Sequence, residues 1–403
     1  MAYRHAGKIF TFFAGLLDFS SAKPGWSAPA TGAEPRSRPI KRGMVMKISG
    51  IGAALAGLLL SSAAHAQSTV TLHEGLGPAE GAVPVDVSRY EARRDGKYTV
   101  GFSNVFTGNS WVIQLLEEAA WRAAQFPEIE RYIVTDANFD PAKQVADVED
   151  MLAQGVDAIV INPTSPVAIV PVLEKAYDSG VAVIIVAADA ETDKATVRIL
   201  ADQVKFGRDG GEFLAEAMGG EGKIISLRGI AGISVDTDRW NGAAEVFAKH
   251  PGIEVVGEVY AQWAYDQGRQ ACESLALAHP QIDGVWSSGG AMTQACIEVF
   301  NELGRDLVPM TGEANNGFFG AWKDNQASGF DSVAPQNPTW MVAEGIAAAV
   351  GVLNGQEIYN EYQVVAEPYY AKDLDALYRP DLNDSYWVGS ILPDDKLKEL
   401  YGK

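Results

Sequence analysis

Pro141-Ala-Lys-Gln-Val-Ala-Asp-Val-Glu-Asp-Met-Leu-Ala-Gln-Gly-Val-Asp-Ala-Ile-Val-Ile161 is the stretch that decides the fold of this chain. Its first part predicts a helix from Pro141 to Gln154, because proline suits the first turn of a helix, where its missing N–H leaves no hydrogen bond unmade. Its last part, Ala158 to Ile161, predicts a strand that is apolar throughout. A strand of this kind is typical of a parallel sheet that helices cover on both faces.

The same alternation of strand and helix extends in both directions from this unit. The predicted strands before and after it are Tyr98–Phe102, Tyr132–Val134 and Val181–Val186. The pattern then restarts, with predicted strands at Lys223–Leu227, Glu254–Tyr260, Gly284–Ser287 and Val308–Met310, each followed by a helical stretch. Alternating strands and helices predict an α/β fold. We therefore expect two doubly wound parallel-sheet lobes, joined by a hinge of about three crossovers.

The restart of the pattern also suggests where the lobes divide. We expect an N-terminal lobe of residues 97–202 and 337–358, and a C-terminal lobe of residues 203–336 and 359–403. The crossovers are expected near Asp202-Gln203, near Gln336-Asn337 and near Tyr359. Residues 67–96 are expected to form a poorly structured start.

Residues 44–66 have the three parts of a secretory signal peptide. Lys47 gives the positive start, Ile48–Leu60 the apolar run, and Ala64-His65-Ala66 the small-x-small cleavage site. The run is shorter than the roughly 20 apolar residues that span a bilayer. The alternative is a buried core helix. Residues 1–43 lie ahead of this pattern, as a long natural leader or as the product of a start codon assigned too far upstream. The sequence thus predicts an exported, periplasmic protein.

The charge of the chain excludes two classes of partner. The formal net charge is −20, and the first 66 residues hold eight basic and two acidic residues, which leaves −26 on the remainder. Such a surface repels nucleic acid and anionic lipid, so we expect no nucleic-acid partner and no membrane insertion. Cys272 and Cys296 are the only cysteines. Export permits a disulfide between them, but sequence does not give its geometry.

Polar and aromatic residues follow the predicted strands. Asn104, Asn162, Asp189, Trp263 and Glu313 all stand at or just after the carboxyl end of a strand. In open α/β sheets, ligands bind at this edge. Hydrogen-bonding groups mixed with planar rings suit a polyhydroxylated ligand, because rings pack on the apolar faces of a sugar and polar groups bond its hydroxyls.

Two motifs make the chain resemble a known family. The first runs from Asp140 through the opening stretch to Asn162-Pro-Thr, and the second is Leu227-Arg-Gly-Ile-Ala-Gly-Ile-Ser234, followed by Arg239 and Gly242. The chain resembles the periplasmic solute-binding proteins of ABC sugar importers, of the ribose and galactose type, over roughly residues 97–360. The resemblance implies a type I periplasmic-binding-protein fold and a monosaccharide or polyol bound between the lobes. It further implies closure about the hinge, and an ABC permease and its ATPase as partners.

The resemblance also implies a set of site residues. By position, Asn162 reaches ligand hydroxyls from the first lobe, Trp111 stacks on the ligand, and Asn109 bonds it. Trp263 falls where the family has a ligand-facing aromatic residue. The remaining candidates are Glu313, Gln336, Asp189 and Arg239, together with Asn104 from the strand-end pattern.

The chain departs from the ribose-type pattern in three places. The Asp-Arg pair that grips ring hydroxyls is replaced by Ala187-Ala188-Asp189, and an expected asparagine by Gly289-Gly290. An arginine expected on the loop before Gly242 appears as Thr237, although Arg239 is close. The scaffold matches but the ribose-specific contacts do not, so we expect another pentose, a hexose, a furanose or a polyol. The two glycines are expected to leave room for a larger group.

Nothing in the sequence indicates catalysis, a cofactor or a metal site. There is no Gly-x-Ser-x-Gly elbow and no paired Cys or His motif of the kind that binds zinc. We predict a monomeric, non-enzymatic binding protein. Two alternatives remain open: a receptor that presents its closed form to a chemoreceptor or sensor kinase, or a binder of a non-sugar small molecule. An exported glycosidase would need a carboxylate pair across the cleft, for which Asp189 and Glu313 are the candidates.

Overall fold

The computed structural model describes residues 67–93 and 96–403, and contains two sheets. The first sheet has seven strands in the order β1-β12-β6-β5-β4-β2-β3. Every neighbouring pair is parallel except β1 with β12. The strands are β1 (Leu76–Pro78), β2 (Tyr98–Asn104), β3 (Ile129–Asp136), β4 (Ala158–Ile161), β5 (Ala182–Val186), β6 (Val197–Leu200) and β12 (Glu361–Val364).

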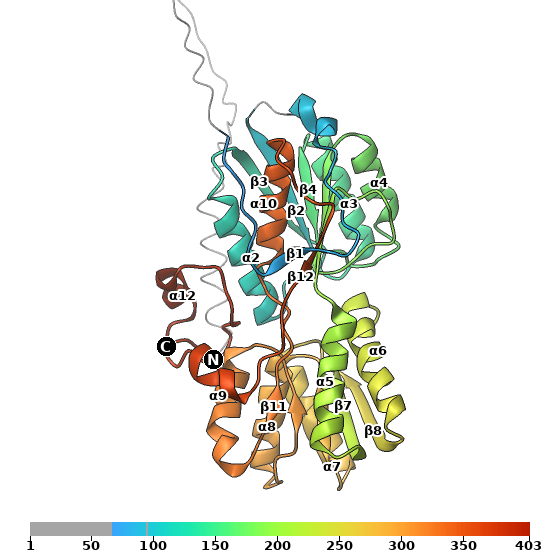
Figure 1. The fold of residues 1–403 in the computed structure, drawn as a ribbon, viewed down its shortest axis with the longest axis vertical. Coiled ribbons are helices and arrows are strands. Elements are labelled where there is room, and N and C mark those ends of the chain that lie inside the picture. Colours follow the sequence, from blue (N-terminus) through green and yellow to red (C-terminus); the bar gives the residue numbers. More distant parts are fainter. Residues whose placement is uncertain (1–66, 94–95) are drawn as a thin grey trace, which may run out of the picture. The chain divides into compact units, whose positions relative to one another are not determined.

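Helices cover both faces of the first sheet, and together they form what we call the first lobe (Figure 1). Alternate residues of a strand point to opposite faces, so Val160 packs with α2 (Ser110–Ala123) and α10 (Met341–Leu353), and Ile159 and Ile161 pack with α3 (Pro141–Ala153) and α4 (Val170–Asp178). All residues of α10 are buried. This explains why the strands read as continuous apolar runs.

The second sheet has five parallel strands in the order β11-β10-β9-β7-β8. They are β7 (Glu221–Arg228), β8 (Gly252–Tyr260), β9 (Gly284–Ser287), β10 (Met310–Thr311) and β11 (Ser332–Val333). The helices are α5 (Gln203–Ala217) and α6 (Ser234–Lys249) on one face, and α7 (Tyr265–Ala278), α8 (Gly290–Glu302) and α9 (Asn316–Asn325) on the other. We call this unit the second lobe. The predicted fold class, two doubly wound parallel sheets, is confirmed.

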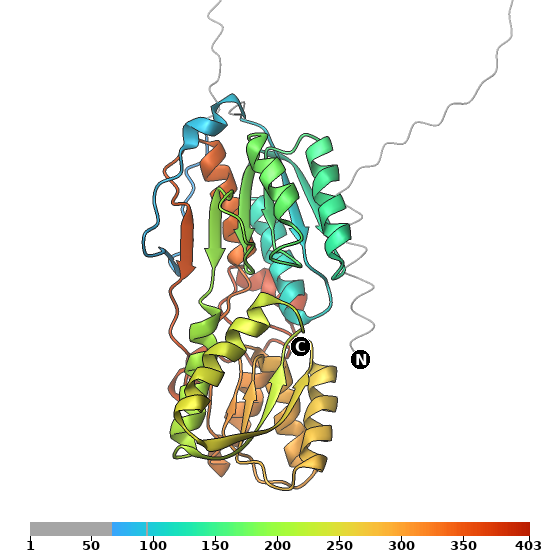
Figure 2. The ribbon, with the colours of Figure 1, turned by 90° about the vertical axis from the view of Figure 1, so that its right-hand side faces the viewer.

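The chain crosses between the lobes at residues 201–202, 334–340 and 365–369. The third crossing differs from the prediction near Tyr359. That residue packs against the core of the first lobe, and the chain then adds β12 to the edge of β6 (Figure 2) before Ala334 and Tyr369 form a bridge. Residues 361–364 therefore belong with the first sheet rather than with the C-terminal lobe. The sequence did not predict β12 because its four residues are too few to show the alternation of apolar and polar residues that indicates a strand.

Residues 67–93 are more ordered than the expected poorly structured start. They supply the edge strand β1 and a short 3-10 helix, η1 (Val87–Arg93). Tyr90 is buried in the first core and its hydroxyl bonds the hydroxyl of Thr196 at 2.7 Å. The predicted signal peptide and the stretch before it lie outside the described residues.

The two cysteines form a disulfide, which answers the question that the sequence left open. Cys272 on α7 and Cys296 on α8 have Cα atoms 5.4 Å apart and are fully buried. Both belong to the second lobe. The covalent link therefore stiffens one lobe and places no restraint on movement between the two.

The C-terminal residues after β12 do more than cover one surface. Short helices η3 (Ala371–Asp373) and α11 (Leu374–Leu377) are followed by an irregular segment and by α12 (Asp394–Tyr401). Within it, residues 384–390, which we call the clasp, touch both lobes: Asn315 forms a bridge with Trp387, and Gln114 of α2 bonds the backbone of Trp387.

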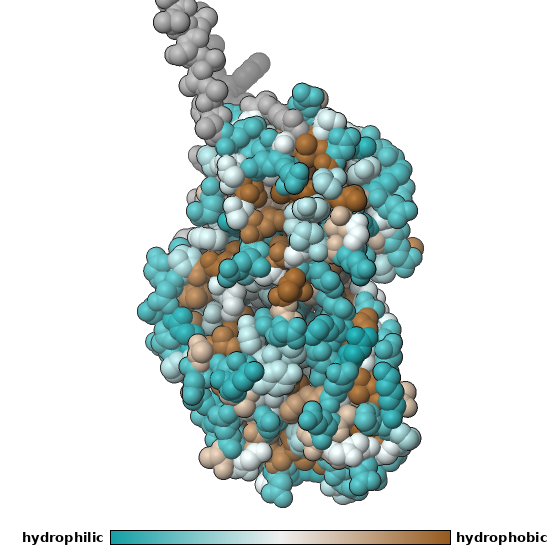
Figure 3. All heavy atoms as spheres, in the orientation of Figure 1, coloured by the Kyte–Doolittle hydropathy of each residue, from teal (hydrophilic) through white to brown (hydrophobic). Residues whose placement is uncertain are grey.

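The surface is mostly hydrophilic on the face shown in Figure 3, where apolar residues lie in scattered groups. Exposed large apolar side chains occur singly, such as Val167 and Leu277, which is normal for a folded surface. Within residues 67–93 and 96–403, no helix combines the length and apolar character that crossing a bilayer requires.

Candidate functional site

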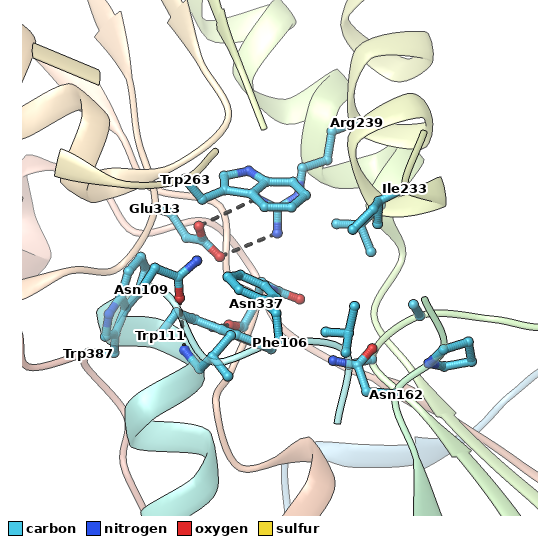
Figure 4. A pocket seen from close by; sticks show the side chains of 16 residues that line it. Phe106, Asn109, Trp111, Asn162, Ile233, Arg239, Trp263, Glu313, Asn337 and Trp387 are labelled. Atoms are coloured by element: carbon cyan, nitrogen blue, oxygen red, sulfur yellow. Dashed lines mark hydrogen bonds and ion pairs between the residues drawn. The ribbon is translucent and has the colours of Figure 1, made fainter. Parts of the chain in front are cut away.

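A cavity of about 590 Å³, part of it open to solvent, lies where the carboxyl ends of strands from both lobes meet. In Figure 4, Trp263, Arg239 and Glu313 stand on one side, and Phe106, Asn109 and Asn162 on the other. The residues that line the cavity are Val105, Phe106, Asn109, Trp111, Val112, Asn162, Pro163, Ala187, Ala188, Ile233, Val235, Arg239, Trp263, Glu313, Asn337 and Trp387.

Six of the nine predicted site residues come together in this lining. They are Asn109, Trp111, Asn162, Arg239, Trp263 and Glu313. Asn109 also caps α2, since its Oδ1 accepts from the N–H of Val112 at 2.9 Å. This bond leaves the amide hydrogens of Asn109 available to a ligand.

The other three predicted residues have different partners. Asn104 is fully buried, and its amide donates to the carbonyl of Phe106 at 2.6 Å, so it shapes the loop beside the cavity. Asp189 is exposed and pairs with Arg198 at 3.0 Å. Gln336 donates to the carbonyl of Glu367 at 2.7 Å. The carboxylate pair of the glycosidase alternative is therefore not assembled.

The polar centre of the cavity is a buried ion pair. Nη2 of Arg239 lies 3.3 Å from Oε1 of Glu313, and only 1 % and 3 % of these two residues is exposed. Arg239 also donates to Gln203 Oε1 at 2.8 Å and to the carbonyl of Ser288. Burial raises the pKa of Glu313, and Arg239 opposes that shift, followed by Asn337. Because the two charges face each other, the cavity offers hydrogen bonds without a net charge.

Trp263 depends on two glycines for its position. A Cβ on Gly229 would lie 2.1 Å from the Trp263 ring, and one on Gly289 2.8 Å from it. The indole Nε1 donates to Ser288 Oγ at 2.8 Å, and the backbone of Trp263 has a φ of 52°. A positive φ is strained for a residue with a side chain, and such strain clusters at functional sites. Gly289 therefore makes room for Trp263, and the expectation of extra ligand space at the glycine pair is wrong.

Small apolar residues form the wall where the ribose-type Asp-Arg pair was missing. Ala187 and Ala188 line the cavity, and Ala187 has a φ of 64°. In the same lining, Phe106 stacks on Phe139 with ring centroids 4.0 Å apart. Val105 and Phe106 also pack with Ile233 of the second lobe. At Ala187 and Ala188, a ligand would therefore meet apolar contacts in place of the hydrogen bonds that an Asp-Arg pair provides.

Three important lining residues escaped the sequence analysis: Phe106, Asn337 and Trp387. Asn337 accepts from Trp111 Nε1 at 2.9 Å through its carbonyl and from Gln203 at 3.0 Å through its side chain. Neighbouring residues of an extended chain point in opposite directions, so the prediction of Gln336 was one residue away. Trp387 lies far along the chain, where only tertiary structure brings it to the site.

Glu118 on α2 makes the stability of the protein depend on pH. Burial raises the pKa of its carboxyl to about 7, opposed first by Ser390, then by Thr339, Gln114 and the backbone of Ile391. A carboxyl whose pKa is raised in the folded state binds its proton more tightly there than in the unfolded chain. Stability is therefore fully present at acid pH and falls as pH rises from about 4.5 to about 7.

The variant Glu118→Gln is expected to remove this slope. The glutamine oxygen can still accept from Ser390 Oγ and from Gln114 Nε2, at 2.5 and 3.1 Å in the wild type. Relative to the variant, the wild type should lose up to about 3 kcal/mol of unfolding free energy between pH 4.5 and pH 7. Urea denaturation at several pH values measures this, and parallel curves for the two proteins would contradict it.

Comparison with known proteins shows which proteins this chain is similar to. A model of the periplasmic binding protein domain matches residues 100–357. The ribose import binding protein of Bacillus subtilis (strain 168) is 28 % identical over 265 residues, which cover 65 % of this chain and 84 % of that protein. A xylitol-binding protein of Mycolicibacterium smegmatis is 29 % identical over 238 residues, covering 59 % and 67 %.

A solved structure is similar over the same region. The ABC transporter periplasmic solute binding protein of Actinobacillus succinogenes 130z, with bound D-allose, superposes with a TM-score of 0.58 at 25 % identity, covering 70 % of this chain and all of that one. The expected type I arrangement of the lobes is thereby confirmed. Because the family model spans well over half of the sequence, the chain belongs to the periplasmic binding protein domain family.

Proposed function

We propose that this protein is the substrate-binding component of an ABC importer and that a neutral monosaccharide or polyol occupies the cavity. One observation carries the proposal. The only ionisable residues among those that line the cavity are Arg239 and Glu313, and they neutralise each other. Around this pair stand aromatic rings and amide groups, which match the apolar faces and hydroxyls of such a ligand.

The relatives support a ligand of this class. Their names and bound molecules include ribose, xylitol and D-allose, which are uncharged polyhydroxylated compounds. The alanine wall and the ion pair in this chain favour a ligand that presents an apolar edge to Ala187 and Ala188 and hydroxyls to Arg239 and Glu313. A missing hydroxyl would leave buried polar groups unpaired, which is the physical basis of selectivity.

Hinge closure is the proposed mechanism. The ligand touches residues of both lobes only when they are together, so it binds the closed form better and shifts the equilibrium toward it. Residues 201–202, 334–340 and 365–369 would flex. The closed form would then deliver the ligand to a membrane permease driven by its ATPase. Export through residues 44–66, a monomeric state and the lack of catalysis belong to the same proposal.

A thermal-shift screen tests the proposal. The purified protein is heated with pentoses, hexoses and polyols, and with amino acids, nucleosides and sugar acids as controls. A ligand at a hundredfold excess over its Kd adds about 2.7 kcal/mol to the apparent stability. We expect a large shift with one neutral sugar or polyol and none with sugar acids. A shift from a control class alone would overturn the assignment of ligand class.

A further inference from the structure

The clasp is bound firmly to the second lobe. The N–H of Val388 donates to the carbonyl of Ala314 at 2.9 Å, and the N–H of Asn316 to that of Tyr386 at 2.8 Å. The side-chain amide of Asn315 donates to the carbonyl of Asp384 at 3.0 Å. Backbone bonds and an asparagine at the start of α9 thus hold one side of the clasp in place.

The other side of the clasp is bound to α2 of the first lobe through side chains. Gln114 exchanges two bonds with the backbone of Trp387, donating from Nε2 to its carbonyl and accepting its N–H at Oε1, both at 2.9 Å. The indole Nε1 of Trp387 donates to Ser110 Oγ at 2.9 Å. A segment bonded to both lobes must release one of them before the cavity can open.

Trp387 also stands between two cavities. It lines the candidate ligand cavity and a second one of about 710 Å³, part of it open to solvent, which His73 and Trp340 also line. Trp387 therefore contributes to the lining of both cavities. The clasp lies beyond residues 100–357, the part of the chain that the family model covers.

We propose that Trp387 is a ligand-contacting, selectivity-determining residue and that the bonds between Gln114 and the clasp keep the closed cavity shut. This inference rests on the proposed function, because it assigns parts to the same cavity. The bonds to α2 are the ones that break on opening, since each of them depends on a side chain, whereas the second lobe also holds the clasp by backbone-to-backbone bonds.

The experiment compares three variants of the full protein: Gln114→Met, Trp387→Phe and, as a matched control, Asp375→Asn. Asp375 lies in the same C-terminal region but pairs with Lys323 on the surface of the second lobe. Binding of D-ribose, xylitol and D-allose is followed by stopped-flow tryptophan fluorescence. Gln114→Met leaves the N–H and carbonyl of Trp387 without their partners, so its dissociation rate should rise at least tenfold with little change in association rate.

Trp387→Phe should change the ratio of the Kd values for the three compounds at least threefold, and Asp375→Asn should leave rates and ratios unchanged. The inference would be overturned if Gln114→Met releases its ligand at the wild-type rate, or if Trp387→Phe keeps the wild-type ratios of the Kd values. If no neutral sugar or polyol of the thermal-shift screen binds the wild type, the proposed ligand class is what fails, and hydrogen exchange then tests the clasp alone. Gln114→Met should speed exchange at the Trp387 amide relative to Asp375→Asn, and equal exchange would refute the clasp.

Discussion

Replacing Arg239 by methionine is expected to lower the unfolding free energy by about 3–5 kcal/mol and to abolish measurable ligand binding, because a buried carboxylate loses its counter-charge. Glu313 is fully buried and pairs with this guanidinium. Burial already raises the pKa of Glu313 against the opposing effect of Arg239. The cost of the variant should therefore shrink at acid pH, where Glu313 takes up a proton. Urea denaturation at pH 5 and pH 8 measures both effects.

A double variant separates folding from binding. Arg239→Met with Glu313→Met removes both charges, so stability should recover much of the loss, whereas ligand binding should stay absent. Lys323→Met serves as a control, because its pair with Asp375 is exposed and should contribute little to stability. A double variant that is no more stable than Arg239→Met would show that the two charges are not coupled in the folded protein.

Gly207→Ala is expected to lower the stability of the protein and to weaken ligand binding, because Gly207 lies where α5 contacts α6. A Cβ at Gly207 would lie 1.7 Å from the carbonyl oxygen of Arg239, and one at Gly242 2.0 Å from that of Val204. In an open helix this change would gain about 1 kcal/mol of helix propensity. Here it must push α6 away from α5, and overpacking of this kind costs about 1–3 kcal/mol.

The same displacement should weaken binding, because it moves Arg239 away from Gln203 and Glu313. We expect at least a tenfold rise in Kd for whichever compound the wild type binds, measured by titration calorimetry beside chemical denaturation. Gly210→Ala on the same helix is the matched control, since its Cβ would meet the side chains of Thr311 and Trp286, at 3.2 and 3.4 Å, rather than a backbone carbonyl. Equal stability and affinity of the Gly207 and Gly210 variants would contradict the prediction.

Long apolar runs made most of the fold predictable from the sequence. The strands around Ala158–Ile161 and Val181–Val186 are buried on both faces, so their composition alone indicated a covered parallel sheet. The short strands β1, β6 and β12 gave no such signal. Each has three or four residues and depends on its neighbours for partners. The third crossover was misplaced for this reason.

The candidate site was predictable where the side chain follows its own strand end. Asn162, Trp263 and Glu313 stand within three residues of the ends of β4, β8 and β10, and the parallel sheets bring these ends together. Residues that reach the cavity from a crossover or from the C-terminal region were missed. The position of Asn337 depends on which way an extended backbone faces, and that of Trp387 on bonds to α2, neither of which local sequence encodes.

The two sheets also differ in how early during synthesis all of their strands become available. Strands β7 to β11 occupy residues 221–333 without interruption, so the second sheet has all its strands as soon as that stretch has left the ribosome. The first sheet needs β12 at Glu361–Val364 to join β1 to β6, and α10 to cover one face. Domains fold as units when their parts are available. The lobe that begins the described chain is therefore the last one that a nascent polypeptide can complete.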